Sequence, residues 1–299
     1  MNGYISALFD PAMPFVRNAL LAGLLSSILF GTLGAVVTVK RIAGLAGAIS
    51  HAVLGGIGMA LFLSATGVVP GLPPIVGAFV FAVIAAGIIG FVSLKAKQRE
   101  DTVINAVWAI GMSVGVLFIA KTPGYADPMS YLFGNILLVS AKDLVMLSVL
   151  DAAVVFLAWR FYPQIEASAF DEEFARVRGV PTDAIFMATL AVTAIAVVLL
   201  QTFVGLVMVI AMLTLPSGTA GFVSRNLAGM MLGGAIMSAA FTVTGLAASW
   251  ALDMPAGAVV VVVAGAVFLA VSAMAAASAA LGARTRKRAG NQAGPGRPA

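Results

Sequence analysis

Residues 17–41 read RNALLAGLLSSILFGTLGAVVTVKR, an uncharged and largely apolar run enclosed by Arg17 on one side and by Lys40 and Arg41 on the other. About 20 such residues in a helix cross the ~30 Å of hydrocarbon in a bilayer. The run therefore predicts a membrane-spanning helix. Similar runs recur along the whole chain of 299 residues, separated by short polar or Pro/Gly-rich segments. The sequence predicts an all-α, polytopic bundle of transmembrane helices.

Composition supports this class of protein. Hydrophobic residues make up 61% of the chain, charged residues 10%, and the mean hydropathy is +1.08. A soluble domain is about one-quarter charged. The net charge of +5 comes largely from residues 284–288 and from single Lys and Arg residues at the ends of apolar runs. We interpret this positive charge as a signal of membrane topology and of contact with anionic lipid headgroups, rather than as a signal of nucleic-acid binding. The absence of cysteine excludes disulfides and thiolate metal ligands.

The apolar runs predict about nine spans, at residues 17–39, 44–66, 74–94, 102–121, 143–162, 183–201, 203–221, 227–249 and 256–281. Eight spans are also possible, because the run at 203–221 is short. Pro216 lies inside that run. Proline removes a helix hydrogen bond, so we expect a kink or break there.

Basic residues orient the spans. They follow the first, third, fifth, seventh and ninth runs, whereas the intervening loops carry few of them. Cytoplasmic loops carry the excess of Lys and Arg. We therefore expect a multi-pass protein of the plasma (inner) membrane with its N-terminus outside and its C-terminus in the cytoplasm. Residues 1–281 form the transmembrane domain, and the basic, Gly/Pro-rich segment 282–299 is expected to be a disordered tail.

The largest loop predicted to be cytoplasmic spans residues 162–184 and contains DEEFARVRGV at 171–180. Acidic residues begin this stretch and arginines end it, as in a short helix. Phe170, Phe174 and Val177 recur at three- and four-residue spacing and make one apolar stripe. Such a helix could lie on lipid headgroups, or its stripe could fill a groove on a partner protein.

Several stretches carry a resemblance to a known family. The opening pair of runs includes GAISHAVLGG at 47–56. Further stretches follow in order, namely REDTVINAVWAIGMSVGVL (99–117), YLFGNILLVSAKDL (131–144), FDEEFARVRGV (170–180), FVGLVMVIAMLTLPSGTA (203–220) and LDMPAGAVVVVVAGAVFLAVS (252–272). Together they resemble the membrane subunit of the zinc/manganese class of ATP-binding-cassette importers.

The resemblance implies a type II importer-like permease that works as a homodimer, driven by two cytoplasmic ATPase subunits and supplied by an extracytoplasmic solute-binding protein. It implies that the 162–184 loop is the coupling helix that docks on the ATPase. The residues that match this motif are Phe170, Asp171, Glu172, Phe174, Ala175, Arg178 and Gly179. The sequence contains no Gly-Lys dipeptide and hence no phosphate-binding loop. We expect a transporter subunit that is not itself an enzyme, with ATP hydrolysed by a partner chain.

The single histidine, His51, falls within the second predicted span. Ionisable side chains at this depth usually face a cavity or a partner. Family members commonly carry an acid four positions before it, where this chain has Gly47. His51, the adjacent Ser50 and the intramembrane Asp151 are the candidate pathway residues. The alternative for the two ionisable side chains is a hydrogen bond that serves helix packing. No permanently bound cofactor is expected, only a transported divalent ion such as Zn²⁺ or Mn²⁺.

Two alternative functions remain at this point. A permease of the same architecture could carry a metal chelate or another small solute, which the glycine at position 47 favours. An ion-coupled secondary transporter or an intramembrane enzyme is less favoured, because the sequence has no H-E-x-x-H motif and only one deeply placed acid.

Overall fold

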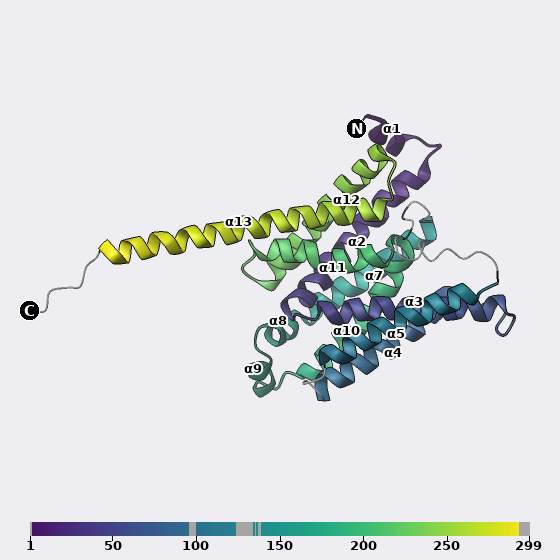
Figure 1. Ribbon diagram of the computed structural model, residues 1–299, viewed down its shortest axis with the longest axis horizontal. Coiled ribbons are helices and arrows are strands. Elements are labelled where there is room, and N and C mark those ends of the chain that lie inside the picture. The colour runs from purple at the N-terminus through teal and green to yellow at the C-terminus, as the bar shows by residue number, and fades with distance from the viewer. Residues whose placement is uncertain (1, 96–99, 124–133, 135, 137–138, 293–299) are drawn as a thin grey trace, which may run out of the picture.

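The computed structural model describes residues 2–95, 100–123, 134, 136 and 139–292. These residues fold into helices joined by short turns (Figure 1). The helices are α1 (Asn2–Phe9), α2 (Pro14–Val39), α3 (Ala43–Ala65), α4 (Pro74–Lys95), α5 (Glu100–Lys121), α7 (Ala141–Arg160), α8 (Tyr162–Phe170), α9 (Glu172–Val177), α10 (Thr182–Val204), α11 (Leu206–Gly221), α12 (Leu227–Leu252) and α13 (Ala256–Gln292). The all-α fold expected from the sequence is confirmed.

The number of spans is lower than the sequence suggested. Seven helices of the described chain are long and apolar enough to cross a membrane, or eight if α7 is counted together with α8, which bends away from it by 70°. The helix α11 has 16 residues and reaches about 24 Å, which is short for a crossing. The count of nine is therefore not confirmed, although each predicted run does form a helix.

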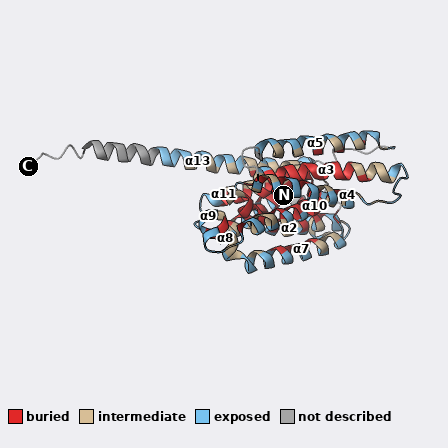
Figure 2. Ribbon diagram, turned by 90° about the horizontal axis from the view of Figure 1, so that it is seen from below, coloured by how far each residue is buried: buried red, intermediate tan, exposed pale blue. Residues whose placement is uncertain are grey.

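The bundle is built around α2 and α3, and α3 is the most deeply buried span. The helices α4 and α5 pack directly against α3, while α7, α11 and α12 pack against α2. Figure 2 shows α5 and α7 on opposite sides of the bundle, with the buried α3 and α2 between them. The two sides of the bundle therefore present different helices.

Glycines allow the closest helix contacts. A Cβ atom added at Gly56 of α3 would lie 2.0 Å from the carbonyl oxygen of Gly77 in α4. A Cβ added at Gly111 of α5 would lie 2.6 Å from the Cα of Ala52 in α3. Small residues let helices approach closely in lipid, where apolar burial alone gives little association energy. The helix α3 is thus fixed on two sides by backbone contact.

The break expected at Pro216 is not present, whereas the chain does break close to the junction expected between the runs at 183–201 and 203–221. The helix α11 continues through Pro216, and the break lies earlier, at Gly205 between α10 and α11. Gly205 has φ of 83° and ψ of 160°, a conformation open essentially to glycine alone. A proline inside a membrane helix is tolerated when neighbouring groups satisfy the freed carbonyl.

The C-terminal helix also differs from expectation. The segment 282–299 was expected to be disordered, but α13 continues as a helix to Gln292 and projects from the bundle in Figure 1. Alanine, arginine and lysine, which dominate residues 279–289, are strong helix formers. The remainder of the expected tail, 293–299, lies outside the described residues.

Candidate functional site

His51 lies on the central helix α3 and is 7% exposed. Its Nδ1 atom is 2.9 Å from the carbonyl oxygen of Gly47, one helical turn earlier. A carbonyl oxygen can only accept a hydrogen bond, so in the neutral imidazole Nδ1 carries the proton. This tautomer leaves the lone pair on Nε2 free. A backbone carbonyl that fixes the ring in this way is the usual second partner of a metal-binding histidine.

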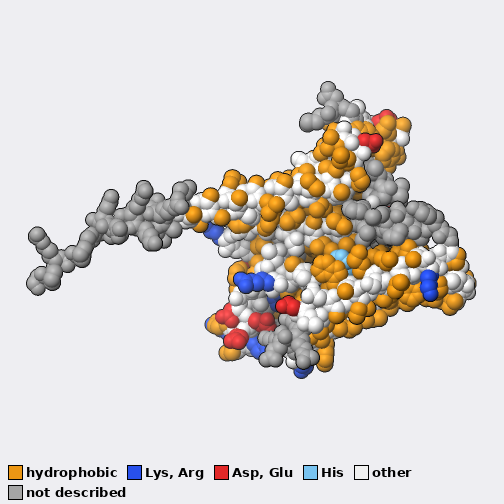
Figure 3. All heavy atoms as spheres, viewed as in Figure 1, with side chains coloured by type: hydrophobic (Ala, Val, Ile, Leu, Met, Phe, Trp, Pro, Cys, Tyr) orange, Lys and Arg blue, Asp and Glu red, His pale blue; other side chains and the backbone are white. Residues whose placement is uncertain are grey.

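An aromatic ring holds the other side of the imidazole. Trp108 of α5 stacks against His51 with ring centroids 4.4 Å apart and an angle of 33° between the planes. Trp108 itself is 41% exposed. In Figure 3 the imidazole, in pale blue, reaches the face of the molecule on the α5 side. The contact of Trp108 with His51 was not predicted, because the sequence does not show which helix packs beside α3.

Gly47 is buried, yet a Cβ added there would meet nothing within 4 Å. The structure therefore has open space one turn from His51. The carbonyl of Gly47 orients the imidazole, and the missing side chain leaves room beside it. No other glycine of α3 with full burial has such space around it.

Ser50 is less suited to a pathway role. Its side chain is fully buried, and its hydroxyl donates to the carbonyl of Ala46 at 2.9 Å. The hydroxyl therefore satisfies the helix to which it belongs. Ser50 stays a candidate only through the two lone pairs of its hydroxyl oxygen.

Asp151 lies far from the imidazole in the packing of the bundle. It is 5% exposed in the middle of α7, and neither carboxyl oxygen has a hydrogen-bond partner within the part of the chain that the structure describes. The helix α7 packs mainly against α2, whereas α3 packs against α4 and α5. The structure therefore does not bring Asp151 and His51 together. Among the described residues, no three His, Cys, Asp or Glu side chains are grouped so that they could hold a metal ion.

The second candidate region is the loop formed by α8 and α9. Phe170, Phe174 and Val177 are 65%, 56% and 88% exposed, so the predicted apolar stripe faces outward. Arg178 lies over the ring of Phe174, 5.0 Å from its centroid. Large apolar side chains exposed together at the polar end of a bundle indicate a surface that contacts either another protein or membrane lipid.

The remaining residues of the predicted coupling motif shape this loop. The Asp171 carboxylate caps α9 by accepting from the backbone N–H of Phe174 at 2.9 Å. Ala175 is 1% exposed and faces the bundle. Gly179 ends the helix with φ of 83°, in the left-handed region that favours glycine.

Arg176 ties α9 to the start of α10, which the sequence analysis did not predict. Its guanidinium donates to Glu172 at 3.3 Å, to Asp183 at 2.5 Å and to the Thr182 hydroxyl at 3.2 Å. The spacing of Glu172 and Arg176 could have signalled the first of these pairs. The pair with Asp183 spans a turn whose path the sequence does not define.

The end of α2 lies beside the same loop. Burial lowers the pKa of the Lys40 ammonium, and the negative charge of Glu172 acts on it in the opposite direction. The helix α9 is therefore in electrostatic contact with α2, the helix at the centre of the bundle.

A bundle of apolar spans, a histidine fixed inside it and an exposed amphipathic loop at one end define a polytopic permease. The chain belongs to the ABC 3 transport family, which matches residues 12–275.

Three similar proteins place this membership in context. The chain is 34% identical to a probable metal transport system membrane protein of Chlamydia muridarum, over 87% of this chain and 89% of that protein. It is 30% identical to the manganese transport system membrane protein MntC of Listeria monocytogenes, over 85% and 88% of the two chains. Its fold is similar to that of PsaBC from Streptococcus pneumoniae, with a TM-score of 0.79, 28% identity, and coverage of 90% of this chain and 94% of that chain.

Proposed function

We propose that this protein is the membrane permease subunit of an ATP-driven importer of a divalent metal ion, either Zn²⁺ or Mn²⁺. The observation that carries the proposal is the geometry of His51. Its Nδ1 is engaged by the Gly47 carbonyl, which leaves Nε2 as a free ligand inside a spanning helix. Imidazole suits Zn²⁺ and other borderline ions, whereas oxygen ligands suit Mn²⁺. The names of the Chlamydia and Listeria relatives support a metal as the transported substrate.

One copy of the chain supplies too few ligands for tight binding, which suits a pathway rather than a storage site. We propose that two copies assemble side by side and bring two His51 imidazoles toward a shared path. The side of the bundle that carries α5 would face the second copy, because His51 and Trp108 lie on that side. Weak and incomplete coordination would let the ion leave as readily as it enters.

We further propose that the α8–α9 loop docks on a cytoplasmic ATPase. The exposed Phe170 and Phe174 would enter a groove of the ATPase, while Arg176 carries the movement into α10. An external solute-binding protein would deliver the metal to the opposite end of the bundle.

The orientation that this requires places α8 and α9 in the cytoplasm. Figure 3 shows Lys and Arg side chains gathered near that end of the molecule, as expected for a cytoplasmic side. Because the chain has no cysteine, single cysteines report topology cleanly. In whole cells, Val68→Cys should react with a membrane-impermeant thiol reagent, and Glu173→Cys should react only after the cells are opened. The reverse pattern would contradict the orientation.

A second candidate substrate is a metal chelate. The open space at Gly47 favours it, because a cargo that brings its own anionic ligands would need room and no protein carboxylate. The test is uptake into proteoliposomes that contain the permease, its ATPase and its binding protein. Uptake of free Zn²⁺ or Mn²⁺ that requires ATP supports the first proposal. Uptake that appears only with a chelated metal supports the second, and ATP-independent uptake driven by an ion gradient would contradict both.

A further inference from the structure

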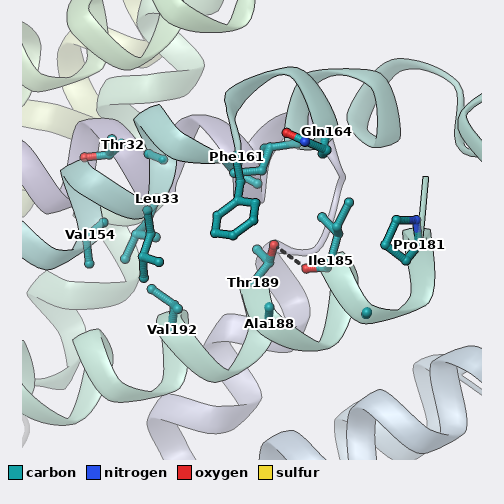
Figure 4. Close-up of a pocket in the computed structure, with 15 residues that line it drawn as sticks. Thr32, Leu33, Val154, Phe161, Gln164, Pro181, Ile185, Ala188, Thr189 and Val192 are labelled. Carbon is teal, nitrogen blue, oxygen red and sulfur yellow. Dashed lines mark hydrogen bonds between the residues drawn. The ribbon is translucent and has the colours of Figure 1, made fainter. Parts of the chain in front are cut away.

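A groove lies on the side of the bundle away from His51. The helices α7 and α10 form its walls, α2 forms its floor, and α8 closes one end (Figure 4). Its volume is about 380 Å³. Leu33, Val154 and Val192 line the deep end, and Phe161, Gln164 and Pro181 line the end near α8. Neither the metal pathway nor the ATPase surface proposed above uses this groove.

The lining is apolar apart from three side chains. The hydroxyls of Thr32 and Thr189 donate to the carbonyls of Ile28 and Ile185 in their own helices. Gln164 differs, because its Oε1 atom is buried and has no hydrogen-bond partner. The Oε1 atom has almost no accessible surface, so it is not open to a ligand in the groove. The groove therefore presents a long, almost entirely apolar surface, which fits an acyl chain.

The groove matches one leaflet of a bilayer in position and length. From Pro181 to Val192, α10 extends about 16 Å, close to half of the ~30 Å hydrocarbon core. Ala184 and Ala188 of α10 and Leu157 of α7 line the groove and are exposed. The groove is thus open sideways from the bundle, at the depth where acyl chains surround the protein.

The charge at the α8 end indicates the headgroup. Arg160 ends α7 with its guanidinium carbon 5.2 Å from the centroid of the Phe161 ring, and that ring lines the groove. A guanidinium at this level pairs well with a phosphate.

We propose that this groove is a binding site for an anionic phospholipid, for which phosphatidylglycerol serves as the probe. One acyl chain occupies the groove between α7 and α10, and the phosphate pairs with Arg160. The lipid belongs to the cytoplasmic leaflet, which rests on the orientation proposed above. Because the lipid contacts both α8 and α10, it supports the segment that joins the spans to the α8–α9 loop.

A second copy of the chain is a less suitable occupant. The helix α7 lies on the side of the bundle opposite α5, and α5 carries the Trp108 that contacts His51 (Figure 2). A twofold partner that shares the His51 path therefore covers the α5 side and leaves the groove to lipid.

The test uses the permease purified with its ATPase from vesicles of phosphatidylglycerol and phosphatidylcholine, with bound lipid counted by mass spectrometry. Ala188→Phe fills the groove from an exposed position, and Ala191→Phe, exposed on the same helix but outside the groove, is the matched control. We expect about a tenfold fall in bound phosphatidylglycerol for A188F, because removing two methylene groups of the acyl chain from the groove weakens lipid binding by about this factor. The control should retain it. Equal lipid content in both variants would overturn the proposal, and Ala184→Phe repeats the test if A188F folds poorly.

The headgroup is tested separately. Arg160→Gln should reduce the preference for phosphatidylglycerol over phosphatidylcholine about fivefold, the effect of one basic residue at a membrane surface. Lys142→Gln, at the other end of α7, should not. An unchanged preference in R160Q would contradict the assigned headgroup. Loss of the permease dimer in A188F would identify the groove as an interface between copies and overturn the lipid assignment. None of these measurements depends on metal transport.

Discussion

The helix α3 and the α8–α9 loop are held in place in opposite ways. Backbone contacts through glycines fix α3 against α4 and α5, and nearly all of its middle is buried. The loop keeps its large apolar side chains exposed and is tied to α10 by the ion pair between Arg176 and Asp183. A rigid element can hold one ligand in a fixed geometry, whereas a loop with polar ties can move with a partner. Substitutions that disturb the packing of α3 should therefore affect assembly of the permease, and substitutions in the loop should affect its coupling to the ATPase.

The largest effect should come from closing the space between α3 and α4. Gly56→Ala places a Cβ atom 2.0 Å from the Gly77 carbonyl oxygen, so the helices must separate. We expect a loss of about 3 kcal/mol or more in stability, at the upper end for overpacking. The yield of folded permease after detergent extraction measures it. Gly47→Ala is the matched control, since its Cβ meets nothing. Equal yields would show that close packing does not hold α3.

The next effect concerns the exposed stripe of the loop. Phe174→Asp puts a charge where we propose that the ATPase buries an aromatic ring. We expect co-purification of the ATPase to fall about tenfold or more, as for a central aromatic contact in an interface. The permease should still insert, because Phe174 is exposed. Glu173→Gln on the same short helix serves as the control. Undiminished co-purification of the ATPase with F174D would refute the docking assignment.

A smaller effect should follow from Arg176→Ala, which removes both ion pairs. The partners are about half exposed, so each pair contributes only ~0.2–1 kcal/mol. We expect the ATPase to remain bound while metal-stimulated ATP hydrolysis falls about two- to fivefold, because the tie to α10 is lost. Arg178→Ala, which leaves that tie intact, should instead weaken binding. A loss of binding in R176A equal to that in F174D would show that Arg176 belongs to the docking surface itself.

Sequence was sufficient for the spans and the loop because both depend on local patterns. Apolar runs of span length predicted the nine longest helices, though not how many of them cross the membrane. The apolar residues of the loop are exposed as expected, but they lie on two helices, since Phe170 ends α8 and Phe174 belongs to α9. The junction between the runs that end at 201 and begin at 203 predicted a break close to Gly205, but the sequence does not show which glycines adopt a positive φ. Trp108 was missed for a related reason, because its contact with His51 depends on which helices pack together. The sequence placed Asp151 in the middle of a span, but it could not show whether Asp151 lies beside His51, because that depends on which helix α7 packs against.

The central claim is that His51 presents a free Nε2 to a metal ion on the translocation path. The most direct measurement is metal uptake by cells that express the whole transporter with His51→Ala, compared with Ser64→Ala on the same helix. Alanine keeps the helix and removes only the ligand, so H51A should lose most uptake at normal permease levels while S64A transports normally. Gly47→Asp in the same assay should keep transport of a bare ion and shift preference toward Mn²⁺, since it adds an oxygen ligand where space exists. Normal uptake by H51A would contradict the claim and make the histidine a packing residue.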